Sequence, residues 1–208
     1  MESLYSQELY IILSTPPAGF PTRKSGIVGM CAMLSLKALI EGYDKTHTKE
    51  AKAYAHDIFS KISGFMLPFS VTRVLRKYNT PHKKITAKRL TPPQKIALLK
   101  ENLQEGPIFL LIANARGGTH VPKMGRAITR RHYITLRGYD ERKQIFFVYD
   151  SNTKERISHD VPMGNSRLSY KDTVKYRSIG ASRIVRNYAI SVKYPHFPDW
   201  KKLNTYYT

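Results

Sequence analysis

Apolar positions repeat at helical spacing in the first half of the chain. Residues 30–42 and 48–62 each carry apolar side chains three and four positions apart, which predicts two helices, the first ending near Gly42. Ser70 is predicted to cap a third helix that continues to Tyr78. The stripe of the second helix consists of Ala51, Tyr54, Ala55, Ile58, Phe59 and Ile62.

The second half of the chain reads mainly as strands. Thr91 followed by two prolines predicts the start of a fourth helix, because prolines in a first turn lack amide donors that would be unpaired anyway. The continuous apolar run 108–113 predicts a buried strand. Residues 131–152 predict a β-hairpin, since two aliphatic and aromatic runs flank a polar centre. A short helix at 170–177 and a strand at 188–192 follow.

This order of elements predicts the fold class. Helices come first and a mainly antiparallel sheet follows, which is typical of an α+β protein rather than of alternating βαβ units. The 208 residues predict one domain with a sizeable core. We expect residues 1–20 to be an N-terminal extension of that domain and residues 194–208 a C-terminal tail.

The net charge of the chain indicates which classes of partner it is expected to bind. A net charge of +20 favours anionic partners, either nucleic acid or another anionic surface. The basic residues are spread along the sequence, and no nucleic-acid-binding motif accompanies them. The apolar runs are too short to span a bilayer, and the N-terminus lacks the basic start of a secretory signal. We therefore expect a cytoplasmic protein, with export by a route that leaves no such signal as the alternative.

Cys31 is the single cysteine of the chain. One cysteine excludes an internal disulfide framework and a zinc site built from several cysteines. His47, His56 and His82 have no second ligand at metal spacing, so neither a metal nor another cofactor is predicted. Cys31 is then either a small buried residue or a nucleophile.

The predicted hairpin favours the interpretation of Cys31 as a nucleophile. With its turn centred on Glu141, His132 lies opposite Asp150, where Cβ atoms are about 4.5–5.5 Å apart. The Asp150 carboxylate would then fix the orientation of the imidazole, and His132 would act as a base. Cys31 follows a glycine-bearing loop at a helix start, where the helix dipole favours a thiolate. Together the three residues predict a Cys-His-Asp triad.

These motifs resemble the peptidase C39-like branch of the papain-like cysteine peptidases. The matching text is Cys31-Ala-Met-Leu, residues 98–112, the run His132-Tyr-Ile-Thr-Leu-Arg-Gly-Tyr-Asp, and Val148-Tyr-Asp. The resemblance covers roughly residues 20–193 and implies a papain-like fold. It also implies a hydrolase that cleaves a peptide or other amide bond through a thioester.

The chain departs from the family pattern at two positions. The family usually has an oxyanion-binding glutamine six residues before the nucleophile, where this chain has Ser25. Loss of one such donor typically costs on the order of 10²–10³ in rate. Asp150 is followed by Ser-Asn instead of the usual proline. Asn152 is two residues after Asp150, so on a strand the two side chains would point to the same face. Asn152 is therefore a rival for the orienting role.

Residues 114–130 are predicted to form a basic loop before His132. Within and beside this loop, His120, Arg126 and Arg131 are candidates for substrate binding, and their charge favours an acidic peptide or protein substrate. Two other functions stay open from sequence alone. One is an acyltransferase, such as a transglutaminase-like enzyme, on the same fold. The other is a degenerate homologue that binds nucleic acid or an anionic surface without cleaving.

Overall fold

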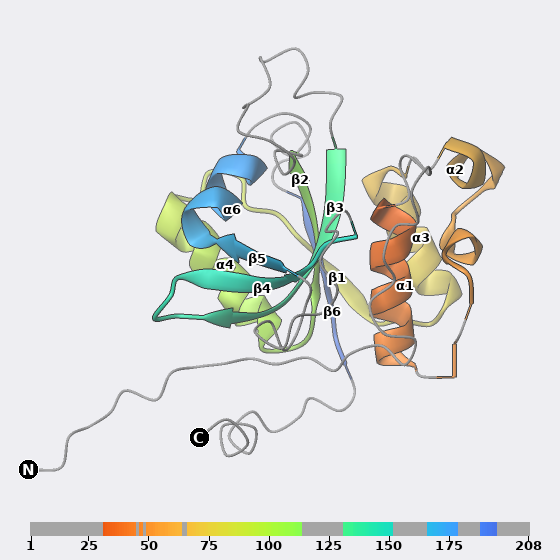
Figure 1. Ribbon diagram of the computed structural model, residues 1–208, viewed down its shortest axis with the longest axis horizontal. Helices are drawn as coiled ribbons and strands as arrows, with labels where there is room; N and C mark the ends of the chain where they lie inside the picture. Colours follow the sequence, from red (N-terminus) through yellow and green to blue (C-terminus); the bar gives the residue numbers. More distant parts are fainter. Residues whose placement is uncertain are drawn as a thin grey trace, which may run out of the picture.

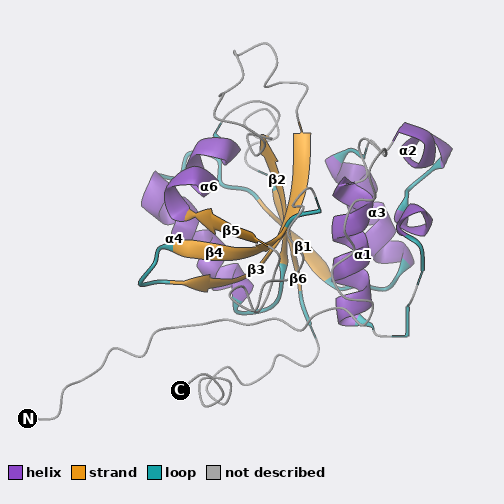
Figure 2. Ribbon diagram, in the orientation of Figure 1, coloured by secondary structure: helices purple, strands orange, loops and turns teal. Residues whose placement is uncertain are grey.

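Six antiparallel strands form the centre of the protein, and helices lie on both sides of the sheet (Figures 1 and 2). The computed structural model describes residues 31–44, 46–47, 49–63, 66–113, 131–151, 166–178 and 188–194. The strand order is β1-β6-β2-β3-β4-β5, with every neighbouring pair antiparallel. The mixed helical and antiparallel architecture confirms the predicted α+β class.

Along the described part of the chain, four helical elements come first, and most of the strands follow them. The strands are β1 (His82–Ile85), β2 (Ile108–Ala113), β3 (Arg131–Asp140), β4 (Ile145–Tyr149), β5 (Ser166–Ser169) and β6 (Ala189–Val192). The helices are α1 (Cys31–Tyr43), the 3₁₀ helix η1 (Ala51–Tyr54), α2 (Ile58–Ser63), α3 (Pro68–Lys77), α4 (Pro92–Leu103) and α6 (Tyr170–Arg177). In the described ranges, no helix has the length and apolar content needed to cross a bilayer.

Strand β2 is apolar throughout because both of its faces are covered. Phe109 and Leu111 join the core that α1 and α3 complete on one side of the sheet. Ile108, Leu110 and Ile112 join the core that α4 completes on the other side. All six residues of the strand are buried, as the uninterrupted apolar run predicts.

The boundaries of α4 follow from its terminal residues. The Thr91 amide donates to Gln94 Oε1 at 2.9 Å, half of a capping box that satisfies a backbone group at the helix start. After the helix, Gly106 lets the chain pass against β6, since a Cβ at this position would overlap the carbonyl oxygen of Val192. Strand β2 therefore begins directly beside β6.

The predicted helix over 48–62 is wrong. The structure has η1, an extended residue at Ala55 and then α2, so two short elements replace one helix. Asp57 Oδ1 accepts a hydrogen bond from the Ser60 amide at 2.6 Å, which caps a new helix start inside the apolar stripe. The third helix also begins two residues before the predicted cap Ser70, with Pro68 in its first turn.

The predicted register of the hairpin is displaced by two residues. Thr135 pairs with Tyr149, so Asp150 is level with Ile134 instead of His132. Two features cause the displacement: a four-residue turn at 141–144 in place of a turn centred on Glu141, and a bulge between Leu136 and Gly138. A two-residue displacement preserves the side of the sheet on which each side chain lies.

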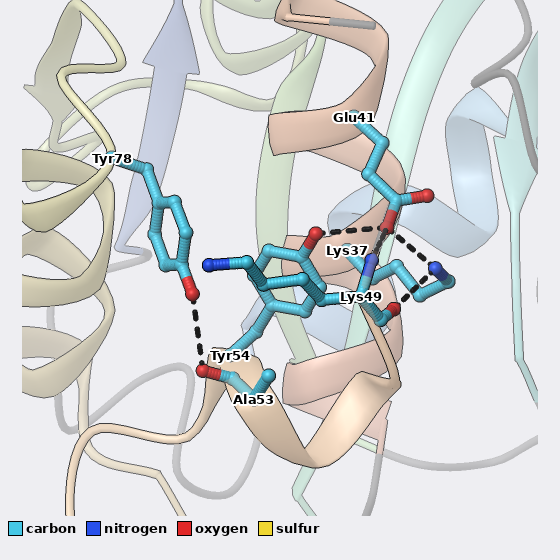
Figure 3. Close-up of polar contacts among 6 residues, drawn as sticks. All are labelled: Lys37, Glu41, Lys49, Ala53, Tyr54 and Tyr78. Carbon is cyan, nitrogen blue, oxygen red and sulfur yellow. Dashed lines mark hydrogen bonds and ion pairs between the residues drawn. The ribbon is translucent and has the colours of Figure 1, made fainter. Parts of the chain in front are cut away.

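A buried carboxylate ties the segment before η1 to helix α1 (Figure 3). Glu41 is fully buried, and its Oε1 accepts hydrogen bonds from Lys37 Nζ at 2.5 Å, the Lys49 amide at 3.0 Å and Tyr54 Oη at 2.8 Å. Lys37 Nζ also donates to the Lys49 carbonyl at 2.6 Å. These bonds offset the cost of burying the charge and fold the chain back along α1.

Candidate active site

Cys31 is the first residue of helix α1 and is partly exposed. At a helix start the backbone amides lack intrahelical partners and favour a nearby negative charge. One turn further along, the buried Ser35 Oγ donates to the carbonyl oxygen of Tyr133 at 3.2 Å. Tyr133 follows His132 on β3, so this bond fixes the first turn of the helix beside the strand that carries the histidine.

His132 and Asp150 form a buried pair. The second residue of β3 is His132, and Asp150 directly follows β4. The His132 Nε2 atom lies 2.7 Å from Asp150 Oδ1, with side chains only 1% and 2% exposed. A carboxylate at this distance fixes the imidazole ring and leaves Nδ1 as the ring nitrogen available to another group.

The cysteine and the histidine change one another's proton affinity. Burial raises the pKa of Cys31, but a hydrogen bond and the charge of His132 outweigh that effect and lower the pKa below its ordinary value of 9.0. Burial lowers the pKa of His132, but hydrogen bonds with Asp150 and Cys31 outweigh that effect, and its pKa rises above the ordinary 6.5. Both directions favour a thiolate beside an imidazolium.

Tyr149 closes the site on the side of α1. It is fully buried and packs with Leu34 and Ala38 of that helix. Burial and the nearby charges of Asp150 and Cys31 raise the pKa of its hydroxyl, so the side chain stays neutral. Tyr149 therefore lies beside Asp150 and Cys31 without adding a charge of its own.

Of the predicted site residues, three come together, and the side chains of the other five lie outside the part of the chain that the structure describes. Cys31, His132 and Asp150 meet where the start of α1 faces β3 and the end of β4. Ser25, His120, Arg126 and Asn152 are outside the described residues, as is the side chain of Arg131. Within the described ranges, no cluster of three or more histidine, cysteine, aspartate and glutamate side chains is arranged to hold a metal ion.

Sequence reasoning missed Ser35 and Tyr149 as parts of this site. Ser35 had a readable signal, since it is a small polar residue four positions after Cys31 in an otherwise apolar stretch. Tyr149 had none, because an aromatic residue within a strand is most simply core. Its place beside Cys31 follows from how α1 packs on the sheet.

Comparison with known proteins agrees with this geometry. The sequence profile of the Peptidase_C39 like family matches residues 4–178, which is most of the chain. No curated protein sequence matches the chain significantly.

Two solved structures resemble the fold at low sequence identity. One is the peptidase domain of Streptococcus ComA, a bifunctional ABC transporter involved in a quorum-sensing pathway, with a TM-score of 0.50 and 10% identity. That likeness covers 84% of this chain and 98% of the other. The second is a double-glycine-motif protease from an AMS/PCAT transporter in complex with the leader peptide, with a TM-score of 0.50 and 12% identity. It covers 88% of this chain and 96% of the other.

Proposed function

Because the chain belongs to the Peptidase_C39 like family, we propose that it is a cysteine peptidase with Cys31 as its nucleophile. The observation that carries the proposal is the continuous contact from Cys31 through His132 to the buried Asp150. A lone cysteine in a core would have a raised pKa, whereas the histidine lowers the pKa of Cys31. Such activation is what nucleophilic catalysis by a thiol needs.

The reaction proceeds in two steps through a thioester. His132 takes the proton of the Cys31 thiol, and the thiolate attacks the carbonyl carbon of the scissile amide. His132 then gives this proton to the departing amine as the C–N bond breaks, which leaves an acyl group on sulfur. In the second step His132 takes a proton from water as the oxygen attacks the acyl carbon, the C–S bond breaks to release the acid, and His132 returns the proton to the Cys31 sulfur. Asp150 orients His132 and stabilises the imidazolium throughout.

Backbone amides beside Cys31, at the start of α1 and on β3, are suited to stabilise the oxyanion. Hydrogen bonds with the backbone of Tyr133 and Ala32 lower the pKa of Cys31, so donors already point towards the sulfur. A tetrahedral intermediate formed on this sulfur would carry its negative oxygen near the same helix terminus. This arrangement reduces the dependence of the reaction on a glutamine at the position of Ser25.

The proposed substrate is a peptide segment with acidic side chains. The similar protease was solved with a leader peptide, which supports a peptide substrate here. The net charge of +20 favours acidic sequences over basic ones during encounter.

The test is cleavage of a peptide library that contains acidic, neutral and basic members. Wild type and Cys31→Ala are incubated with the library, and mass spectrometry identifies new peptide termini and any acyl adduct on Cys31. We expect cleavage at a defined bond and an adduct in wild type only. Incubation with and without an added primary amine distinguishes hydrolysis from acyl transfer, because amide products that form in preference to free acids would indicate a transferase. Equal products with Cys31→Ala, or no adduct with any peptide, would overturn the proposal.

A further inference from the structure

Three large apolar side chains project into solvent from one part of the helical side. Ile58 is 74% exposed, Leu67 37% and Phe69 49%, and in the described residues no other large apolar side chain is classed as exposed. They lie within twelve residues, on α2 and at the start of α3 (Figure 1). We refer to these three residues as the α2–α3 tip. Clustered exposed apolar residues mark contact surfaces more often than scattered ones do.

Side-chain contacts join α3 to the segment just before α2. The Arg73 guanidinium lies 5.5 Å from the centre of the Phe69 ring. His56, just before α2, packs edge-on against Phe69 with ring centres 6.5 Å apart, and its Nε2 lies 3.4 Å from Arg73 Nη1. Ile58 follows His56 by two residues, so the start of α2 lies close to the start of α3.

Positive charge borders the tip. Phe69, Arg73 and Arg76 fall four and three residues apart, which places them on one face of α3, and both arginines are exposed. Lys61 is exposed three residues after Ile58 on α2. Residues 51–90 contain nine lysines and arginines and a single acidic residue, Asp57. The Asp57 carboxylate already pairs with His56 at 2.6 Å.

We propose that the α2–α3 tip docks on the surface of an anionic lipid bilayer. Exposed apolar side chains beside arginine and lysine are the pattern of interfacial membrane binding, where the apolar groups enter the headgroup region and the cations pair with anionic lipids. Charge complementarity selects this occupant over a second copy of the chain, because two copies would bring like-charged borders together. Nucleic acid would satisfy the cations but leave Ile58 and Leu67 exposed, since phosphate contacts cover no aliphatic surface.

The experiment is vesicle co-sedimentation with the full chain. Vesicles of phosphatidylcholine alone are compared with vesicles of phosphatidylcholine mixed with phosphatidylserine. We expect binding to the mixed vesicles that weakens with added salt, and much less binding to the neutral ones. The double variants Ile58→Ser/Phe69→Ser and Arg73→Gln/Arg76→Gln should each bind roughly tenfold or more weakly.

The matched control removes two positive charges elsewhere. Lys171 and Lys175 are exposed on α6, on the far side of the sheet (Figure 1), and Lys171→Gln/Lys175→Gln should retain binding within about twofold. An equal loss in this control would assign the binding to net charge and overturn the proposal. The proposal would also be overturned if wild type did not bind anionic vesicles. The same holds if wild type self-associates without vesicles and the tip variants abolish that self-association. Cys31 alkylation should be unchanged in every variant, which separates this test from that of peptidase activity.

Discussion

His132 Nε2 lies 2.7 Å from Asp150 Oδ1, and both side chains are buried. A buried charged pair stabilises little by its formation, but removal of one partner leaves an uncompensated group in a low-dielectric site. The pair is therefore sensitive to any change in either residue. Because Cys31 is the sole thiol of the chain, its reactivity reports on this pair directly.

The first prediction concerns the pH dependence of Cys31 alkylation by iodoacetamide. In wild type the midpoint should lie below the ordinary 9.0, because His132 lowers the pKa of the thiol. In His132→Ala the partner is gone, and burial, which raises the pKa, is opposed only by backbone hydrogen bonds with Tyr133 and Ala32, so the midpoint should move towards or above 9.0. Labelling rates measured by mass spectrometry across pH give both midpoints.

His82→Ala serves as the control for this measurement. His82 lies on the edge strand β1 and its Nδ1 contacts the Thr80 carbonyl at 2.8 Å, so it should leave the midpoint unchanged. An ordinary thiol profile in both wild type and His132→Ala would contradict the thiolate–imidazolium pair.

The second prediction separates the charge of Asp150 from its hydrogen bond. Asp150→Asn keeps an acceptor for the ring but removes the charge, so the pKa of His132 should fall and activity should drop about tenfold. Asp150→Ala removes both and should lower kcat by on the order of 10²-fold or more. Asp140→Asn is the matched control, since Asp140 is also a buried hairpin carboxylate but caps the Lys143 amide at 2.9 Å. If both Asp150 variants were as active as wild type, another residue would have to orient the His132 ring.

The sequence was enough to predict the central elements of the fold. The apolar run 108–113, the two prolines in the first turn of α4 and the hairpin are strong local signals, and the structure confirms each element. The pairing of His132 with Asp150 was anticipated even though the register was wrong, because a displacement of two residues preserves strand parity. Cytoplasmic localisation and the roles of Ser25 and Asn152 stay predictions.

The features that sequence reasoning missed depend on tertiary contacts. Strands β1 and β5 have only four residues each and lie at the two edges of the sheet, where pairing with β6 and β4 defines them. Because of Lys83 and Lys84, β1 lacks the alternating apolar pattern that predicts a strand. Its extended conformation therefore depends on its position beside β6 and not on local propensity. The break at Ala55 likewise depends on the cap that Asp57 provides for α2.

The third prediction treats Ser35 as a positioning residue. Ser35→Ala removes the bond to the Tyr133 carbonyl, which should loosen the alignment of α1 with β3 and slow Cys31 labelling at neutral pH several-fold. The buried carbonyl left without this donor should also cost about 1–3 kcal/mol of stability. Ser191→Ala is a matched control, because Ser191 is a buried serine on β6 whose Oγ lies 3.5 Å from the Asn102 carbonyl. Loss of stability in both variants with slowed labelling in neither would limit Ser35 to a structural role.

The fourth prediction concerns Gly106, where the chain leaves α4 and meets β6. A Cβ there would overlap the Val192 carbonyl oxygen, a backbone atom that cannot move without disturbing the β2–β6 pairing. Gly106→Ala should therefore cost at least about 1–3 kcal/mol, and each kcal/mol lowers Tm by roughly 2–4 °C in a chain of this size. At Gly42 the atom in the way is Tyr194 Oη, 2.5 Å from the added Cβ, at the far end of a side chain whose movement would cost its hydrogen bond to the Leu39 carbonyl but would disturb no strand pairing. Gly42→Ala should accordingly lower Tm less than Gly106→Ala in the same thermal melt, and the reverse order would show that the turn after α4 can adjust.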